Sequence, residues 1–174
     1  MAEKKRKRKA VRGFLSFVLC LEILILIFVY LLVPIKIEGP SMEPNLFDGE
    51  FGLMGRKNVF KKMPQYNDVV VVKIENDTNE LIIKRTVGLP NDTIEIKGNQ
   101  VYVNGGAFED KYRNINTNMS DMAPLKLHDD EIFVLGDNRN VSLDSRTLGP
   151  IKIKQIQAID GLVYWPLDRI HFME

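Results

Sequence analysis

Ser41 is the first residue whose setting suits chemistry. It lies in the segment EGPSMEP, residues 38–44, with prolines at positions 40 and 44. These prolines restrict the local backbone and disfavour a helix, and Gly39 either lets another backbone approach closely or supplies an unusual dihedral angle. A rigid, non-helical serine of this kind suits a nucleophile, although taken alone it suits an ordinary turn equally well.

Lys84 is the candidate base. It lies in the run LIIKRTV, residues 81–87, whose β-branched residues favour a strand. In a strand, Lys84 shares its face with Ile82 and Thr86. Apolar surroundings disfavour the charged form of a lysine and lower its pKa from ~10.4. A neutral lysine can then take the proton of a serine hydroxyl. The alternative is a lysine on an edge strand that points at solvent.

A third segment, GDNRNVSLDSR at residues 136–146, is dense in hydrogen-bonding groups. It could brace a catalytic site, or it could be a solvated loop with ion pairs. Asp137 and Asp144 raise a third alternative, a Ca²⁺ site, but their spacing does not match an EF-hand loop.

The rest of the composition excludes several classes of protein. The chain has two histidines, one cysteine, no HExxH motif and no glycine-rich phosphate loop, so neither a metal nor a cofactor is expected. The net charge is +1, but residues 1–13 alone carry seven basic residues and one acidic residue. The remainder is acidic and has no basic stripe, and nucleic acid is therefore not an expected partner.

The N-terminal part predicts a membrane anchor. Residues 14–33 form an apolar run with a single charge, Glu22. As a helix, this run spans roughly 30 Å, the thickness of a hydrocarbon core. A cleavable signal peptide usually has a shorter apolar stretch and a small-x-small site, which the exit LLVPIK lacks. Because basic flanks stay in the cytoplasm, the sequence predicts a cytoplasmic tail (1–13), a single-pass anchor in the cell membrane (14–33) and an extracytoplasmic domain (34–174).

Short β-branched runs separated by Gly, Pro, Asn and Asp predict that the fold is mainly β, with an all-β domain after the anchor. The segment TIEIKGNQVYVNG, residues 93–105, alternates on both sides of residues 97–100 and predicts a hairpin. Residues 105–130 are polar and poorly patterned, and a long excursion or mobile loop is expected there. Apolar residues of Phe47–Met63, and those near Trp165, are either core residues or contacts with the bilayer. The expected strands cover residues 68–74, 81–87, 93–96, 101–103, 131–135 and 158–164.

Together and in this order, the segments resemble type I signal peptidases, the bacterial Ser-Lys family, in its compact Gram-positive form. Ser41–Pro44 resembles the nucleophile box, and Asp68–Val71 resembles a second box. Lys84–Asp92 resembles the box of the general base, and Gly136–Arg146 resembles the last box. The resemblance runs from the basic N-terminus to the final strands.

The resemblance implies a role for each residue. Ser41 is the implied nucleophile and Lys84 the implied general base. Four supporting residues are implied near this pair: Ser142, whose hydroxyl orients the lysine ammonium, the structural ion pair of Asp144 with Arg146, and Asp137.

The sequence also departs from the family pattern. Some relatives have a serine two residues before the nucleophile, whose hydroxyl helps to hold the oxyanion. Gly39 stands at that position here, so backbone N–H groups, including that of Ser41, are expected to do more of this work. Asn91 replaces a common Gly and Val141 a common Asn, and neither touches the implied proton transfer.

The implied function is the removal of signal peptides from exported pre-proteins by a membrane-bound serine endopeptidase. The expected partners are these signal peptides and the lipid bilayer, and the sequence specifies no oligomeric state. The alternative is a silent or specialised relative that assembles pili or surface proteins, which would be expected to lose Ser41 or Lys84. Repressor-type Ser-Lys autoproteases should carry no anchor, and an endoplasmic-reticulum signal peptidase should carry His at position 84.

Overall fold

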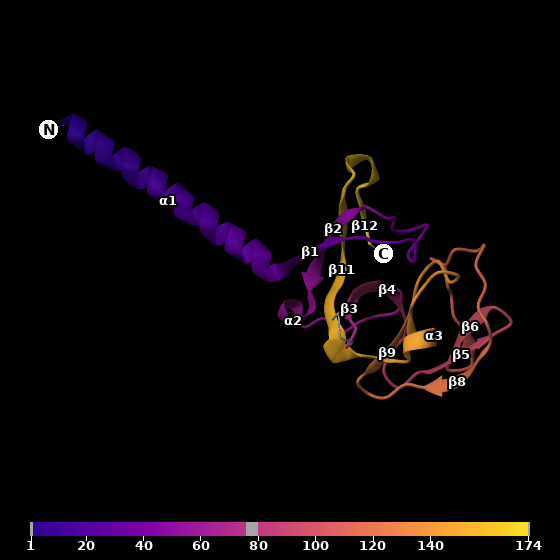
Figure 1. Ribbon diagram of the computed structural model, residues 1–174. Helices are drawn as coiled ribbons and strands as arrows, with labels where there is room; N and C mark the ends of the chain where they lie inside the picture. The colour runs from indigo at the N-terminus through magenta and orange to yellow at the C-terminus, as the bar shows by residue number, and fades with distance from the viewer. Residues whose placement is uncertain (1, 76–79, 174) are drawn as a thin grey trace. The chain divides into compact units, whose positions relative to one another are not determined.

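The computed structural model describes residues 2–75 and 80–173. The chain divides into two compact units, Met1–Leu32 and Val33–Glu174. The first unit is the helix α1 (Ala2–Leu31), of which Val11–Leu31 is long and apolar enough to cross a membrane (Figure 1). The helix therefore begins before the predicted apolar run and ends two residues earlier than predicted. Pro34 accounts for this end, because a proline disfavours helical backbone at the residue before it.

The second unit is built on an eight-stranded sheet. The long strand β11 (Ile156–Trp165) lies inside this sheet and pairs antiparallel with β2, β3 and β12 (Figure 1). On the far side of β3, strands β4 and β9 continue the sheet, each antiparallel to its neighbour. The strands lie in the order β1 (Leu32–Lys36), β2 (Phe51–Arg56), β11, β3 (Val69–Lys73), β4 (Leu81–Gly88), β9 (Glu131–Leu135) and β10 (Ile151–Lys152), with β12 (His171–Phe172) beside β11.

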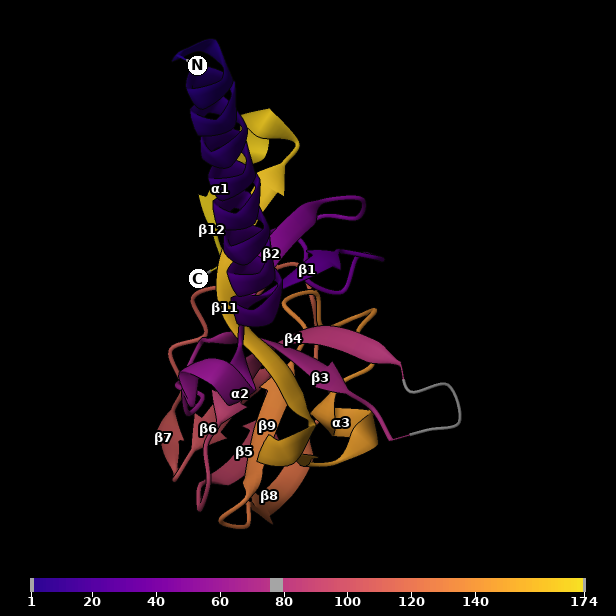
Figure 2. The same ribbon diagram turned by 90° about the vertical axis from the view of Figure 1, so that its left-hand side faces the viewer.

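A smaller, four-stranded sheet lies beside the first and has the order β7 (Gly106–Ala107), β6 (Gln100–Val103), β5 (Thr93–Lys97) and β8 (Met122–Lys126) (Figure 2). Its strands β5 and β6 form the hairpin that the alternating pattern predicts, with Lys97 opposite Gln100. The described residues also form the short helices α2 (Lys57–Phe60) and α3 (Ser145–Leu148) and the 3₁₀ turns η1 (Ile153–Gln155) and η2 (Leu167–Arg169).

The expectation of a long excursion or mobile loop over residues 105–130 is wrong in part. Strand β8 forms within it and pairs with β5, with Ile94 opposite Leu125. The strand has a weak pattern because most of its side chains are not buried, and its Pro124 suits an edge position. Outside β7 and β8 the segment is irregular, but Arg113 fixes it by donating to the backbone oxygen of Asn99.

The core consists of three clusters of buried apolar side chains. Val69 and Val71 of β3 belong to one cluster, whereas Val70 and Val72 belong to another. Strand β3 is therefore buried on both faces, which explains its unbroken apolar run. The third cluster fills the space between the end of β4, strand β9 and the smaller sheet.

The weakly patterned stretch Phe47–Met63 contains both buried core residues and exposed apolar residues. Met54 is fully buried in the core, whereas Phe51, Phe60 and Met63 are exposed. Strand β2 forms in this stretch although its two glycines weaken the strand pattern. At Gly52 a side chain would collide with Met173 and crowd the backbone of Leu162, so this glycine permits a close approach of neighbouring segments.

Candidate active site

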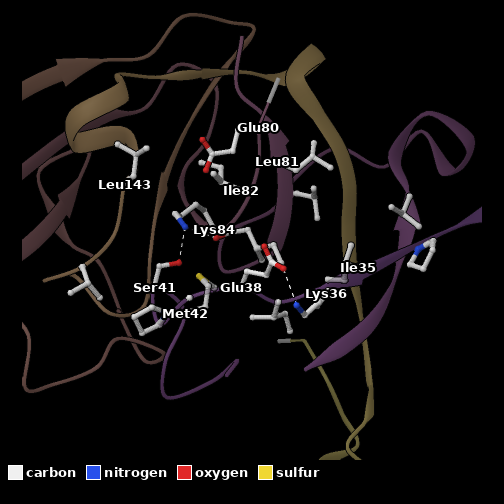
Figure 3. Close-up of a pocket in the computed structure, with 18 residues that line it drawn as sticks. Ile35, Lys36, Glu38, Ser41, Met42, Glu80, Leu81, Ile82, Lys84 and Leu143 are labelled. Carbon is white, nitrogen blue, oxygen red and sulfur yellow. Dashed lines mark hydrogen bonds and ion pairs between the residues drawn. The ribbon is translucent and has the colours of Figure 1, made fainter. Parts of the chain in front are cut away.

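Strand β4 and the turn after β1 bring Lys84 and Ser41 together. The Lys84 ammonium nitrogen, Nζ, lies 2.9 Å from Ser41 Oγ and 2.7 Å from the backbone oxygen of Ile83 (Figure 3). Only 3% of Lys84 is exposed. The alternative of a lysine on an edge strand is therefore wrong, because β4 lies between β3 and β9 and carries Lys84 into the interior.

Burial has a direct electrostatic effect on this lysine. Loss of water lowers the pKa of Lys84 to about 8, while the charges of Asp144, Asp137 and Glu80 oppose the shift. Within residues 2–75 and 80–173, no carboxylate forms an ion pair with Nζ. A minor but appreciable part of Lys84 is therefore neutral near physiological pH and can accept a proton, whereas an ordinary lysine is almost wholly charged there.

The turn that carries Ser41 is held by its backbone. The Ser41 carbonyl accepts from the backbone N–H of Asn138 at 3.0 Å. Gly39 has a φ of +80°, which favours glycine, and its N–H donates to the Asp48 carboxylate at 2.8 Å. The N–H of Ser41 donates no hydrogen bond to any described residue, so this donor, rather than that of Gly39, is available at the site.

Asp144 and Arg146 form the ion pair that the resemblance implies. Two nitrogens of the Arg146 guanidinium each lie 2.8 Å from an oxygen of the buried Asp144 carboxylate. The same carboxylate accepts from the N–H of Gly136 at 3.0 Å and caps helix α3. Burial alone would raise the pKa of Asp144, but the Arg146 guanidinium and the Gly136 N–H outweigh it and lower that pKa. Asp144 thus remains charged and joins the last segment to the end of β9.

Asp137 forms a second buried ion pair, with Arg85. Both contacts between the guanidinium and the carboxylate measure 2.8 Å, and Arg85 is 1% exposed. Asn45, in the turn after Ser41, donates to the same carboxylate at 2.8 Å. Because Arg146 and Arg85 neutralise Asp144 and Asp137, neither carboxylate is available as a Ca²⁺ ligand.

Ser142 lies beside the pair but does not bond to Lys84. Its hydroxyl is buried near the Asp144 carboxylate, whose pKa it helps to lower, yet it makes no hydrogen bond of ordinary geometry with a described residue. Gly136 explains how the segments come so close. A Cβ at position 136 would lie 2.2 Å from Ser142 Oγ and 2.6 Å from the Ser41 carbonyl oxygen. A side chain there would push the two serines away from each other.

The C-terminal segment contacts the turn after Ser41, a contact that no pattern in the sequence indicated. Arg169 pairs with the buried Glu50 at 2.7 Å and lies 3.7 Å from the centre of the Phe47 ring. A ring nitrogen of His171 lies 3.2 Å from the backbone oxygen of Asn45. Arg85 and Asn45 were also missed as site residues. The one available signal was the position of Arg85 next to Lys84 in an apolar strand, which places it on the opposite face.

Ser41 and Lys84 line a cavity of about 580 Å³ (Figure 3). No group of three or more potential metal-binding side chains occurs among the described residues. A serine hydroxyl in contact with a partly neutral lysine can support nucleophilic attack. The other residues that line the cavity are Val33, Pro34, Ile35, Lys36, Ile37, Glu38, Gly39, Pro40, Met42, Val71, Glu80, Leu81, Ile82, Ile83, Val141 and Leu143.

Comparison with known proteins agrees with the resemblance. The family model described as signal peptidase, peptidase S26, matches residues 10–165. The chain belongs to this family.

Several relatives are similar over nearly the whole chain. Signal peptidase I P from Bacillus subtilis subsp. natto is 33% identical, and the match covers 97% of this chain and 96% of the relative. A signal peptidase I from Bacillus amyloliquefaciens is 34% identical over 97% and 95% of the two chains. A crystal structure of a signal peptidase I from Enterococcus faecalis V583 is 28% identical, covers 56% of this chain and 97% of its own, and has a TM-score of 0.48. Family membership supports a peptidase that removes signal peptides.

The Arg85–Asp137 pair predicts a large effect of one charge on stability. Asp137→Asn keeps the shape of the side chain but leaves the buried guanidinium without its counter-ion, which should lower the free energy of unfolding by about 3–5 kcal/mol. Urea unfolding of the detergent-solubilised protein, followed by circular dichroism, measures this change.

Asp130→Asn is the matched control, because Asp130 pairs with Lys152 at 3.5 Å and both side chains are half-exposed. Its expected effect is below about 1 kcal/mol. Equal effects of the two substitutions would contradict the assigned importance of the buried pair.

Proposed function

We propose that this protein is a membrane-bound serine endopeptidase that removes signal peptides from exported pre-proteins, with Ser41 as nucleophile and Lys84 as general base. The observation that carries the proposal is the 2.9 Å contact between Lys84 Nζ and Ser41 Oγ, made by a buried lysine with a lowered pKa. A catalytically silent assembly factor would not need a buried lysine with a lowered pKa in contact with a serine hydroxyl.

The chemistry takes two steps. Neutral Lys84 removes the proton of Ser41 while Oγ attacks the scissile carbonyl, and the N–H of Ser41 donates to the oxyanion. The C–N bond then breaks, and the Lys84 ammonium returns its proton to the leaving amine. Lys84 is neutral again and activates a water molecule, which attacks the acyl-enzyme and releases the signal peptide with a free carboxylate. Ser41 recovers its proton from Lys84.

The anchor places this chemistry near the membrane. We assign residues 1–13 to the cytoplasm, 14–33 to the bilayer and 34–174 to the outer side. Ser41 follows Val33 by eight residues, so at ~3.3–3.6 Å per residue it stays within ~30 Å of the end of the anchor. A signal peptide is itself an apolar segment whose cleavage site follows directly, so enzyme and scissile bond are held at a similar depth.

Exposed apolar residues of the catalytic domain support contact with lipid. They gather where β2, β11, η2 and β12 meet, because Trp165 lies opposite Phe51 and Leu162 lies opposite Phe172. An aromatic cluster of this kind is typical of a membrane interface. Its exposed members are Phe51, Tyr164, Trp165, Leu167, Ile170 and Phe172.

Removal of either member of the pair should abolish turnover. Ser41→Ala and Lys84→Ala should each lower kcat/KM for a pre-protein with an Ala-x-Ala site by at least about 10³-fold, because no neighbouring group can replace either function. Mass spectrometry of the product locates the cut. Ser120→Ala and Lys97→Ala, both at exposed positions, are the matched controls and should cleave normally. Substantial turnover by a folded Lys84→Ala variant would disprove the proposed base.

The activity should depend on pH through Lys84. Because the neutral form is required, kcat/KM should rise about tenfold per pH unit up to the pKa of about 8 and then level off. Glu80→Gln removes a charge that raises this pKa, so it should move the rise to lower pH. Titration of Lys84 by NMR in the Ser41→Ala variant should give the same midpoint. A lysine that titrates near 10.4, with full activity at neutral pH, contradicts the mechanism.

The lowered pKa also makes stability depend on pH. Between about 8, the folded value, and ~10.4, the unfolded value, the unfolded chain binds more protons at Lys84 than the folded chain. The contribution of this residue to the free energy of unfolding should therefore increase with pH across this window and be lowest below it. The difference in unfolding free energy between wild type and Lys84→Met, measured from pH 7 to 10.5, tests the sign.

The orientation of the anchor gives a separate expectation. Protease added to intact protoplasts should digest residues 34–174 and spare the N-terminal tail, because its basic residues remain in the cytoplasm. Antibodies against tags at the two ends distinguish the fragments, and protoplasts lysed by detergent provide the control in which both tags are lost. Protection of the C-terminal tag in intact protoplasts would reverse the assignment.

A further inference from the structure

Two apolar side chains next to the Ser41–Lys84 pair are exposed. Val141 is 54% exposed and Leu143 is 45% exposed, and both line the same cavity as Ser41 and Lys84. They flank Ser142, whose hydroxyl is buried. The backbone thus directs one side chain inward and its two neighbours outward. Exposed apolar side chains at a cavity indicate a surface that another molecule covers.

These side chains lie at a different end of the cavity from the apolar residues that join the core. Figure 3 shows Leu143 on one side of the Ser41–Lys84 pair and Ile35 on the other, where the exposed Leu81 also lies. At the Ile35 end, the partly buried Ile35 and Ile83 pack against the first core cluster. The Leu143 end has no such support, because Val141 and Leu143 belong to none of the three core clusters.

A peptide bound for cleavage must occupy both ends. With its scissile carbonyl at Ser41 Oγ, the acyl half extends to one side and the amine half to the other. Core residues back the Ile35 end, and the acyl half, with the small residues at the end of a signal peptide, is assigned to it. The amine half, which begins the mature protein, then extends along Val141 and Leu143.

We propose that Val141 and Leu143 form an apolar subsite for one of the first two residues after the scissile bond. The inference rests on the proposed function and names a preference within it: substrates whose mature part begins with a large aliphatic or aromatic side chain. Val141 stands where the family commonly has Asn, and so the preference belongs to this chain. An asparagine at that position would replace half of the apolar surface with an amide.

Paired substrates measure the subsite directly. Each pair carries Leu or Ala at the first or the second position after the cut and is otherwise identical. For wild type, the ratio of kcat/KM for Leu over Ala should be about tenfold at one of the two positions, the size of effect that a few methylene groups produce in an apolar pocket. In Val141→Asn/Leu143→Asn, this ratio should fall to about one. Because the ratio compares two substrates of one preparation, it does not depend on the fraction of folded enzyme.

Two variants serve as matched controls. Leu81→Asn changes an exposed apolar residue at the other end of the cavity. Ile115→Asn changes an apolar residue that is 89% exposed and does not line the cavity. Both should keep the wild-type ratio. If the double variant is inactive, the single variants should each reduce the ratio in part. A wild-type ratio near one at both positions, or a ratio that survives the double substitution, overturns the subsite. Failure of wild type to cleave any of the substrates would instead refute the proposed function.

Discussion

The removal of water from Lys84 Nζ is the constraint on which the rest of the site depends. An ammonium buried without a carboxylate in contact is unfavourable, and this cost lowers the pKa to about 8. Arg85, the next residue of the same strand, is buried as deeply but pairs with Asp137 at 2.8 Å. Strand β4 thus carries two cations into the interior, one paired through two contacts and one held against Ser41. The first stabilises the fold, and the second suits proton transfer.

A contact of 2.9 Å between a strand and a turn requires that the turn be held firmly. The turn after Ser41 is fixed from two directions by segments far away in the sequence. Asn45 donates to the Asp137 carboxylate on one side, and its backbone oxygen lies 3.2 Å from His171 on the other. Arg169 adds a pair with the buried Glu50. The end of the chain therefore does more than complete the sheet: it braces the segment that presents Ser41 to Lys84.

Local patterns predicted the parts of the molecule that depend on local sequence. The N-terminal apolar helix, the main strands, the hairpin around residues 97–100 and the four family segments all have a periodicity or motif of their own. The edge strand β8 has no such pattern and was missed. It is stabilised by its pairing with β5. Arg85, Asn45 and His171 were missed for a related reason. Their contacts depend on sheet register and on the path of the C-terminus, which no short window of sequence contains.

The two arginine pairs also resolve an electrostatic conflict. Asp144 and Asp137 join the last segment to the core, yet each carboxylate raises the pKa of Lys84 and so favours its protonated form, which cannot accept a proton. Arg146 and Arg85 each place a positive charge within 2.8 Å of the respective carboxylate. By Coulomb's law, a neighbouring positive charge reduces the attraction that the carboxylate exerts on Lys84. The guanidinium groups therefore let the site keep two structural carboxylates close to the lysine while burial still determines the direction of its pKa shift.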